Sequence, residues 1–249
     1  NLAQVFSVTG QLDKAKKSFK NILNMEPKNG LIWAEYGTVL TKLANYKEGR
    51  DAYLKALEFK PNSPRVHLSL GHVYKTMGEI DNSIDSYKNT ILQNNLSGEA
   101  YWSLANLKTY SFSENEIKDM EDTLNGDMSD IERSQMHFAL GKAYEVKKDF
   151  DKSFKNYYEG NRAKKNLIKY SSNDTTENTK KILEFFNQEN IQNLSKSSTK
   201  DQDPIFVLGM PRSGSTLVDQ IISSHSKVDG PQELPNIIKI ASELNTNGQ

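Results

Sequence analysis

The residues with the clearest potential for chemistry form a glycine-rich loop at positions 209–216. Its sequence, GMPRSGST, places Gly209 and Gly214 at the spacing of the phosphate-binding motif G-x-x-x-x-G-K-[ST]. Glycines at these places let backbone N–H groups turn inward around an anion. The lysine of the motif is missing, because Ser215 follows Gly214 directly.

Three hydroxyls and one guanidinium accompany these glycines. Ser213, Ser215 and Thr216 can donate hydrogen bonds, and Arg212 offers a charged fork to phosphate oxygens. If the loop were only a turn that binds nothing, the presence of two glycines, three hydroxyls and an arginine together would have no explanation. A P-loop kinase or NTPase stays an alternative, although such enzymes use the missing lysine to bridge the terminal phosphates.

The segments around the loop are expected to be a strand and a helix. After Pro204, the run IFVLG (205–209) contains strand formers without alternation, as in a strand buried on both faces. The run TLVDQIISSH (216–225) has the apolar spacing of a helix, whose N-terminus adds partial positive charge at the loop.

The first two thirds of the chain contain an internal repeat with a period of about 34 residues. Small residues let the two helices of a hairpin cross closely, aromatic residues fill the groove between hairpins, and proline ends the second helix. The recurring sets are Ala15, Gly49 and Ser83; Phe19, Tyr53 and Tyr87; Pro27 and Pro61, with Asn95 in the third place; and Gly37, Gly71 and Ala105.

Over roughly residues 3–95 these positions resemble the tetratricopeptide (TPR) family. The matching residues are Trp33, Tyr36, Gly37, Leu40, Gly49, Tyr53, Ala56 and Pro61. The resemblance implies a solenoid of helical hairpins whose concave face, lined mainly by the first helix of each hairpin, binds a protein or peptide. The alternative is a spacer that positions the rest of the chain.

By analogy with the family, ten residues are expected to face the concave surface. They are Leu31, Ala34, Thr38, Thr41 and Lys42 in one repeat, and Arg65, Leu68, His72, Lys75 and Thr76 in the next. Ala34 and Leu68 occupy places where chaperone-docking TPR domains have lysine, and Thr38 and His72 occupy places of asparagine. Docking of a chaperone tail is therefore disfavoured.

The repeat becomes irregular after residue 98. The segment 99–108 is expected to begin another unit, but 109–124 does not continue the period. A further unit is expected at 133–163, and Ser129 or Asp130 can cap its first helix. Residues 164–203 form a linker, in which a helix with apolar residues at Ile182, Leu183, Phe185, Phe186 and Ile191 precedes the polar stretch 193–203.

The glycine-rich loop and its surroundings resemble the PAPS-dependent sulfotransferases. Pro211-Arg212-Ser213-Gly214-Ser215-Thr216 matches in full the loop P-R-S-G-[ST]-T that binds the 5′-phosphosulfate in that family. More narrowly, the order of parts resembles bacterial proteins with TPR repeats ahead of a sulfotransferase domain, and the related tyrosylprotein sulfotransferases.

This resemblance implies a donor, a base and an acceptor. The donor is 3′-phosphoadenosine 5′-phosphosulfate (PAPS), bound by Arg212 and the backbone of residues 213–216, without a metal. Glu233 falls at the place of the general base that takes the proton of the acceptor hydroxyl. The acceptor class stays open: peptide tyrosine, saccharide and small molecule all fit. His225, which ends the loop's helix, is expected to have a structural role.

Composition narrows the setting. The 249 residues carry 32 basic and 32 acidic side chains, so no net charge attracts nucleic acid or an anionic membrane. There is no cysteine, and no apolar run approaches the ~20 residues that cross a bilayer. The beginning, NLAQVFSVTG, lacks the pattern of a signal peptide. These features favour a cytoplasmic protein.

The expected fold is mainly α: a TPR α-solenoid at 1–163, a helix and polar linker at 164–203, and the start of an α/β sulfotransferase domain at 204–249. The element that holds the 3′-phosphate is expected downstream but is not found after Gly230, and Ala3 lies one full period before Gly37. The chain is therefore expected to be a fragment that is inactive alone. A non-catalytic TPR adaptor with a vestigial loop is the alternative function.

Overall fold

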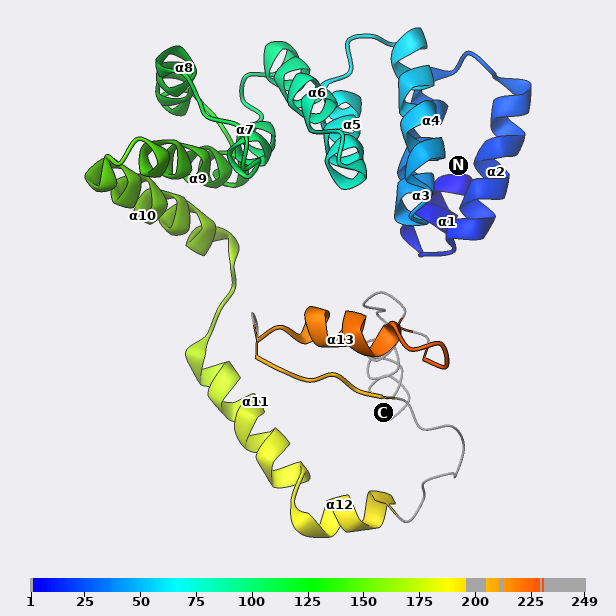
Figure 1. Ribbon diagram of the computed structural model, residues 1–249, viewed down its shortest axis with the longest axis vertical. Coiled ribbons are helices and arrows are strands. Elements are labelled where there is room, and N and C mark those ends of the chain that lie inside the picture. Colours follow the sequence, from blue (N-terminus) through cyan, green and yellow to red (C-terminus); the bar gives the residue numbers. More distant parts are fainter. Residues whose placement is uncertain (1, 196–204, 211–212, 229, 231–249) are drawn as a thin grey trace. The chain divides into compact units, whose positions relative to one another are not determined.

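The structure is a computed structural model that describes residues 2–195, 205–210, 213–228 and 230. It divides into two compact units, Asn1–Ser171 and Ser172–Gln249, which we call the repeat unit and the loop unit. All the described secondary-structure elements are helices, labelled in Figure 1.

The repeat unit is a series of helical hairpins. α1 packs on α2, α3 on α4, α5 on α6 and α9 on α10, and α2–α3, α4–α5 and α6–α7 join neighbouring hairpins. The bounds of the first six helices are α1 (Leu2–Val8), α2 (Leu12–Met25), α3 (Gly30–Lys42), α4 (Tyr46–Phe59), α5 (Pro64–Met77) and α6 (Ile80–Gln93).

The α3–α4 and α5–α6 hairpins are each closed by a glycine on the first helix and a tyrosine on the second, whereas the α1–α2 hairpin has the buried residues Ala3 and Phe19 at these places. A Cβ atom added at Gly37 would lie 2.9 Å from the ring of Tyr53. Gly71 faces Tyr87 in the same way, and Tyr87 is fully buried. Because any side chain here would overlap the ring, the close approach of the two helices requires glycine. The predicted pairing of small and aromatic positions is confirmed.

The helix ends also follow the predicted positions. α2, α4 and α6 end at Met25, Phe59 and Gln93, in each case just before the recurring Pro27, Pro61 and Asn95. Proline cannot donate the backbone hydrogen bond that would continue the helix.

An additional helix interrupts the array after α7 (Gly98–Ala105). α8 (Glu114–Leu124) begins with a capping box in which Ser113 accepts from the Glu116 N–H and Glu116 accepts from the Ser113 N–H. α7 packs on α9 (Asp130–Val146) rather than on a helix in the register of the repeat. The sequence predicted this break, and α8 is the inserted element.

The hairpin of α9 and α10 (Phe150–Leu167) restores the regular packing. A Cβ at Gly141 would lie 2.8 Å from the Tyr157 ring, and the Ser153 hydroxyl donates to the Gly141 carbonyl at 2.8 Å. Ser129 caps α9 by accepting from the Glu132 N–H at 3.2 Å, as predicted. α10 continues through Leu167, past the expected end of the array at 163.

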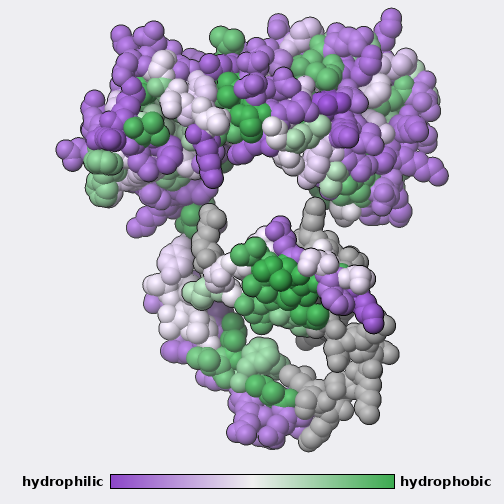
Figure 2. Space-filling model, viewed as in Figure 1, coloured by the Kyte–Doolittle hydropathy of each residue, from purple (hydrophilic) through white to green (hydrophobic). Residues whose placement is uncertain are grey.

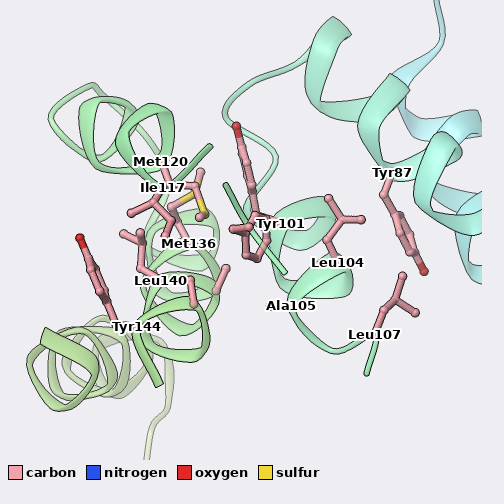
Figure 3. Close-up of a cluster of buried hydrophobic side chains, with 13 residues drawn as sticks. Tyr87, Tyr101, Leu104, Ala105, Leu107, Ile117, Met120, Met136, Leu140 and Tyr144 are labelled. Carbon is pink, nitrogen blue, oxygen red and sulfur yellow. The ribbon is translucent and has the colours of Figure 1, made fainter. Parts of the chain in front are cut away.

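The side chains of α7, α8 and α9 share a buried cluster of 13 residues (Figure 3), to which the second helix of the preceding hairpin contributes Tyr87. Its members are Tyr87, Tyr101, Leu104, Ala105, Leu107, Phe112, Ile117, Met120, Met136, Ala139, Leu140, Ala143 and Tyr144. The irregular part of the array is therefore held by a continuous apolar core.

The loop unit contains α11 (Ser172–Phe185), α12 (Gln188–Ser195) and α13 (Ser215–Ser223), and none of residues 172–193, 205–210, 213–228 and 230 is buried. The helix predicted to carry Ile182, Phe186 and Ile191 is confirmed only in part: α11 ends at Phe185, Phe186 lies in a bend, and Ile191 belongs to α12. Asn187 accepts from the Asn190 N–H at 2.9 Å at the start of α12, and that helix then takes up residues 193–195, which the sequence assigned to the polar loop.

The strand expected at 205–209 does not form in the described residues. The segment runs extended into the loop (Figure 1), and Ile205, Phe206 and Leu208 are exposed. A strand needs hydrogen bonds to a neighbouring strand, and the described part of the chain supplies none. The prediction was wrong because β-forming residues favour extended backbone but cannot by themselves make a sheet.

Among the described helices, none combines the length and the apolar character needed to pass through a bilayer.

Candidate functional site

The described part of the glycine-rich loop is a tight turn. The Ser213 N–H donates to the Met210 carbonyl at 3.0 Å, and the Ser213 hydroxyl occupies the space where a side chain on Gly209 would begin. A side chain on Gly209 would therefore require the Ser213 hydroxyl to turn away. Pro211 and Arg212 lie outside the described residues.

Gly214 joins the turn to α13. Its φ of +91° and ψ of 17° are in the left-handed region, which other residue types enter at a cost of roughly 1–2 kcal/mol. Gly214 has no side chain that could cap the helix, so the N-cap residue provides no side-chain acceptor for the first backbone N–H groups of α13. The turn therefore opens onto a helix N-terminus that can receive an anion.

The predicted hydroxyl donors lie beside this helix N-terminus. Ser213 and Thr216 are exposed and Ser215 is half-buried. Backbone N–H groups, hydroxyls and the positive end of a helix are the donors that suit a phosphate or sulfate group. The described donors therefore suit a phosphate or sulfate group in general, while the place of the Arg212 guanidinium stays a prediction.

The other two predicted residues near the loop have different outcomes. Glu233 lies outside the described residues, and its role as the base stays a prediction. His225 follows α13, and its Nδ1 accepts from the Lys227 N–H at 3.2 Å, which is a local structural contact. Among the described residues no group of His, Asp and Glu side chains is placed to hold a metal ion.

A second candidate site is a pocket of about 290 Å³ in the repeat unit, between α3 and α5. Four of the ten residues predicted to face the concave surface line it: Leu31, Ala34, Thr38 and Arg65. The other lining residues are Glu35, Tyr53, Lys60, Asn62, Ser63, Pro64, Val66 and Ser69. We call it the α3–α5 pocket.

The remaining predicted concave residues do not line this pocket. Thr41 instead packs inside its hairpin, where its methyl group would meet a Cβ on Gly49 at 2.7 Å. Leu68 is half-buried against the cluster shared by α7, α8 and α9. Lys42, Lys75 and Thr76 are exposed.

His72 closes the next junction along the array, between α5 and α7. Its Nδ1 lies 2.9 Å from the Tyr87 hydroxyl, and its Nε2 lies 3.3 Å from Glu99 Oε1. A neutral ring with its proton on Nε2 accepts from Tyr87 and donates to Glu99. The hydrogen bond from His72 lowers the pKa of Glu99 below its ordinary value, although partial burial opposes this change.

Sequence reasoning missed two of these features. The sequence predicts only that Glu99 lies in a helix, although Glu99 stands one period after Arg65 and so occupies the same repeat position. The capping box of Ser113 and Glu116 carries the S-x-x-E signal that predicts the start of α8.

Two family models match parts of this chain. A TPR repeat model matches residues 37–78, which cover α5 and most of the preceding hairpin. A model described as "Sulfotransferase family" matches residues 204–249, which include the glycine-rich loop and α13.

One curated relative matches almost the whole chain. A protein of Aquifex aeolicus (strain VF5), described as uncharacterized, is 29% identical over 236 residues, which is 93% of this chain and 30% of that protein. The chain thus spans less than a third of this relative's length. Because the match is longer than the repeat unit, it includes residues of both units.

Solved structures share the fold of the repeat unit. The crystal structure of MamA has a TM-score of 0.54 at 20% identity and covers 68% of this chain and 98% of its own. YrrB, described as a TPR protein with an unusual peptide-binding site, has a TM-score of 0.51 at 17% identity and covers 66% of this chain and 83% of its own. The chain therefore combines a TPR helical array with a segment, residues 204–249, that matches the sulfotransferase family.

Proposed function

We propose that this chain belongs to a sulfotransferase that moves a sulfuryl group from PAPS to a hydroxyl acceptor, with TPR repeats that bind a protein or peptide. In this proposal residues 1–163 are the repeats, 164–203 connect them to the catalytic domain, and 204–249 are the first part of that domain.

The observation that carries the proposal is the open N-terminus of α13 behind the turn at Gly214. It lies in the segment that matches the sulfotransferase family. It also explains why the lysine of nucleotide-hydrolysing loops is dispensable, since backbone N–H groups and hydroxyls already offer several donors to an anion.

Arg212 and residues 213–216 would hold the 5′-phosphosulfate, and Glu233 would receive the proton of the acceptor hydroxyl. During transfer the acceptor oxygen forms a bond to sulfur as the bond between sulfur and the phosphate oxygen breaks. The chemistry depends mainly on positioning and on stabilising negative charge. The loop supplies these without a metal ion.

The repeats would select the partner. Two described junctions join the first helices of neighbouring hairpins: α3 with α5, and α5 with α7. The α5–α7 junction is closed by the pair of His72 and Glu99, whereas the α3–α5 junction contains a pocket. The likeness to YrrB supports the fold on which a peptide site can be built. The non-catalytic adaptor stays the competing function.

Sulfate transfer from radiolabelled PAPS, measured with the full-length protein and with its Glu233→Gln variant, tests this function. Peptide tyrosine, saccharide and phenolic acceptors are offered in parallel. We expect transfer to at least one class, and a loss of about 10²- to 10⁴-fold in the variant, which is the usual contribution of a general base.

Two outcomes would overturn parts of this proposal. If the Glu233→Gln variant transfers sulfate at the wild-type rate, Glu233 is not the base. If the full-length protein neither binds PAPS nor transfers sulfate, but retains a peptide partner, the adaptor is the correct function. Asp219→Asn, a carboxylate change on α13 outside the proposed site, is the matched control.

A further inference from the structure

The α3–α5 pocket contains an arginine without a partner. Among the arginines that the structure describes, Arg50 pairs with Asp51, Arg133 donates to two backbone carbonyls, and Arg162 pairs with Glu159. Arg65 alone of these has neither a hydrogen bond nor an ion pair, and its side chain is exposed at the pocket. Its planar guanidinium is suited to a carboxylate.

At the next junction along the array, between α5 and α7, the residues at the same repeat positions pair with each other. One period after Thr38 and Arg65 stand His72 and Glu99, which lie 3.3 Å apart. Thr38 is too short and has no charge to pair with Arg65. One junction is therefore closed by its own side chains, whereas the other leaves a cation available to a partner.

A second charge lies at the same pocket. Lys60, the residue that follows α4, lines the pocket and has no ion pair among the described residues. Glu35 also lines it. Two cations and one carboxylate leave the pocket with one net positive charge, which favours an anionic ligand.

The hydrogen bonds inside the pocket define a second requirement for the ligand. The Thr38 hydroxyl lies 3.1 Å from the Ala34 carbonyl and 3.1 Å from the Tyr53 hydroxyl. When Thr38 donates its one proton to Ala34, Tyr53 donates to Thr38. The Tyr53 oxygen then keeps a lone pair that can accept from an N–H group.

The remaining lining residues include apolar side chains on the flanking helices, while Asn62, Ser63 and Ser69 add polar groups. Leu31, Ala34 and Val66 lie on the two helices that flank the pocket, and Leu31 is 61% exposed. A volume of about 290 Å³ is at the lower end of the roughly 300–1,000 Å³ of small-ligand sites. It suits a few residues of an extended chain rather than a folded domain.

We propose that the α3–α5 pocket binds an extended protein segment that carries an Asp or Glu next to a small apolar residue. The carboxylate pairs with Arg65 and Lys60, a backbone N–H donates to Tyr53, and the apolar side chain lies against Leu31, Ala34 and Val66. This inference rests on the proposed peptide-binding role of the repeats and names the class of partner.

Fluorescence polarisation with the full chain and two pools of short labelled peptides tests the proposal. In one pool a small apolar residue stands next to Asp or Glu at the centre, and in the other the acid is replaced by Asn or Gln. We expect the acidic pool to bind about tenfold more tightly, because hydrogen bonds to charged groups contribute more than neutral ones.

Two variants locate the effect. Arg65→Glu should remove the preference for the acidic pool, and its thermal unfolding should match that of the wild type, because the exposed Arg65 side chain makes neither a hydrogen bond nor an ion pair. Lys47→Glu makes the same change of charge at an exposed position of α4 that does not line the pocket. This control should bind both pools as the wild type does.

Each other outcome decides against the proposal in a distinct way. Equal binding of both pools, or an unchanged preference in Arg65→Glu, shows that peptides bind elsewhere; the proposed peptide-binding role then survives without this site. Full displacement of the acidic pool by inorganic phosphate shows a phosphate site instead. Binding of neither pool removes the peptide-binding role as well, while the transfer assay with PAPS still decides the catalytic part.

Discussion

The two compact units differ in where their side chains find partners. In the repeat unit, the tyrosine that closes a regular hairpin meets a glycine on the preceding helix, as Tyr53 meets Gly37 and Tyr157 meets Gly141. In the loop unit none of residues 172–193, 205–210, 213–228 and 230 is buried. Apolar side chains gather on its surface over α13 (Figure 2), where Leu217, Val218 and Ile221 are exposed.

This difference explains why one unit can be derived from its sequence more fully than the other. A hairpin carries both halves of its contact within one period, so the spacing of glycines and tyrosines is sufficient to predict it. The loop depends on donors that surround an anion, and a strand depends on neighbouring strands. Local sequence predicts the turn but not those partners.

The largest expected effect is a difference in the free energy of unfolding between two leucine-to-alanine variants, one in each unit. Leu140 is 1% exposed in the cluster shared by α7, α8 and α9, whereas Leu217 on α13 is 62% exposed. Leu140→Ala should lower the free energy of unfolding by about 2–5 kcal/mol, and Leu217→Ala by less than about 0.5 kcal/mol. Urea unfolding followed by circular dichroism measures both.

The control for that contrast is Leu31→Ala, an exposed leucine in the repeat unit, which should also have a small effect. If Leu217→Ala costs as much as Leu140→Ala, the apolar face of α13 is covered in solution, and the contrast between the units is wrong.

Two glycines with similar backbone conformations sharpen the comparison. Gly78 ends α5 at φ +79°, and Gly214 precedes α13 at φ +91°. Alanine at either position should cost roughly 1–2 kcal/mol in local strain. We expect Gly214→Ala to reduce the affinity for PAPS and Gly78→Ala to leave it unchanged, as measured by calorimetry. Equal effects on PAPS affinity would mean that the geometry of Gly214 has no special role at the site.

The smallest expected effect concerns Glu99. Its pKa is lowered by the hydrogen bond from His72, so the ionised carboxylate is stabilised in the folded chain. This contribution is present above the ordinary pKa of 4.5 and is lost as the pH falls through the lower pKa of the folded state. For a pair this exposed it should stay below about 1 kcal/mol.

Urea unfolding of the wild type and of Glu99→Gln at neutral and at strongly acidic pH tests this expectation. The difference in stability should shrink on acidification, whereas Asn89→Ala, which changes an exposed uncharged side chain of α6, should show no such trend. A difference that stays constant or grows at acidic pH would contradict the His72–Glu99 assignment.

Sequence and structure agree most closely where a contact is steric and local. The period of the repeat predicted the hairpins and the helix ends before Pro27 and Pro61. The resemblance to the TPR family placed Leu31, Ala34, Thr38 and Arg65 on one surface. The period carries no information about charge pairing. Only the distances between the first helices of neighbouring hairpins show that Glu99 pairs with His72 and that Arg65 has no such partner.

Within the loop unit the sequence predicted the turn and α13 but failed for residues 205–209. Strand formers predicted a strand there, and the described residues contain no neighbour to pair with it. Gly214 was predicted from its place in the motif, and its left-handed backbone gives the physical reason. Arg212 and Glu233, which complete the proposed chemistry, stay predictions from the sequence.

The central claim is that the loop binds phosphosulfate rather than a nucleoside triphosphate. Isothermal titration of the full-length protein with PAPS and with Mg·ATP, repeated for Arg212→Ala, tests it most directly. We expect PAPS to bind more tightly than Mg·ATP, and Arg212→Ala to weaken PAPS binding by about tenfold or more, because a charged hydrogen-bonding partner is lost. Tight binding of Mg·ATP with no affinity for PAPS would contradict the account.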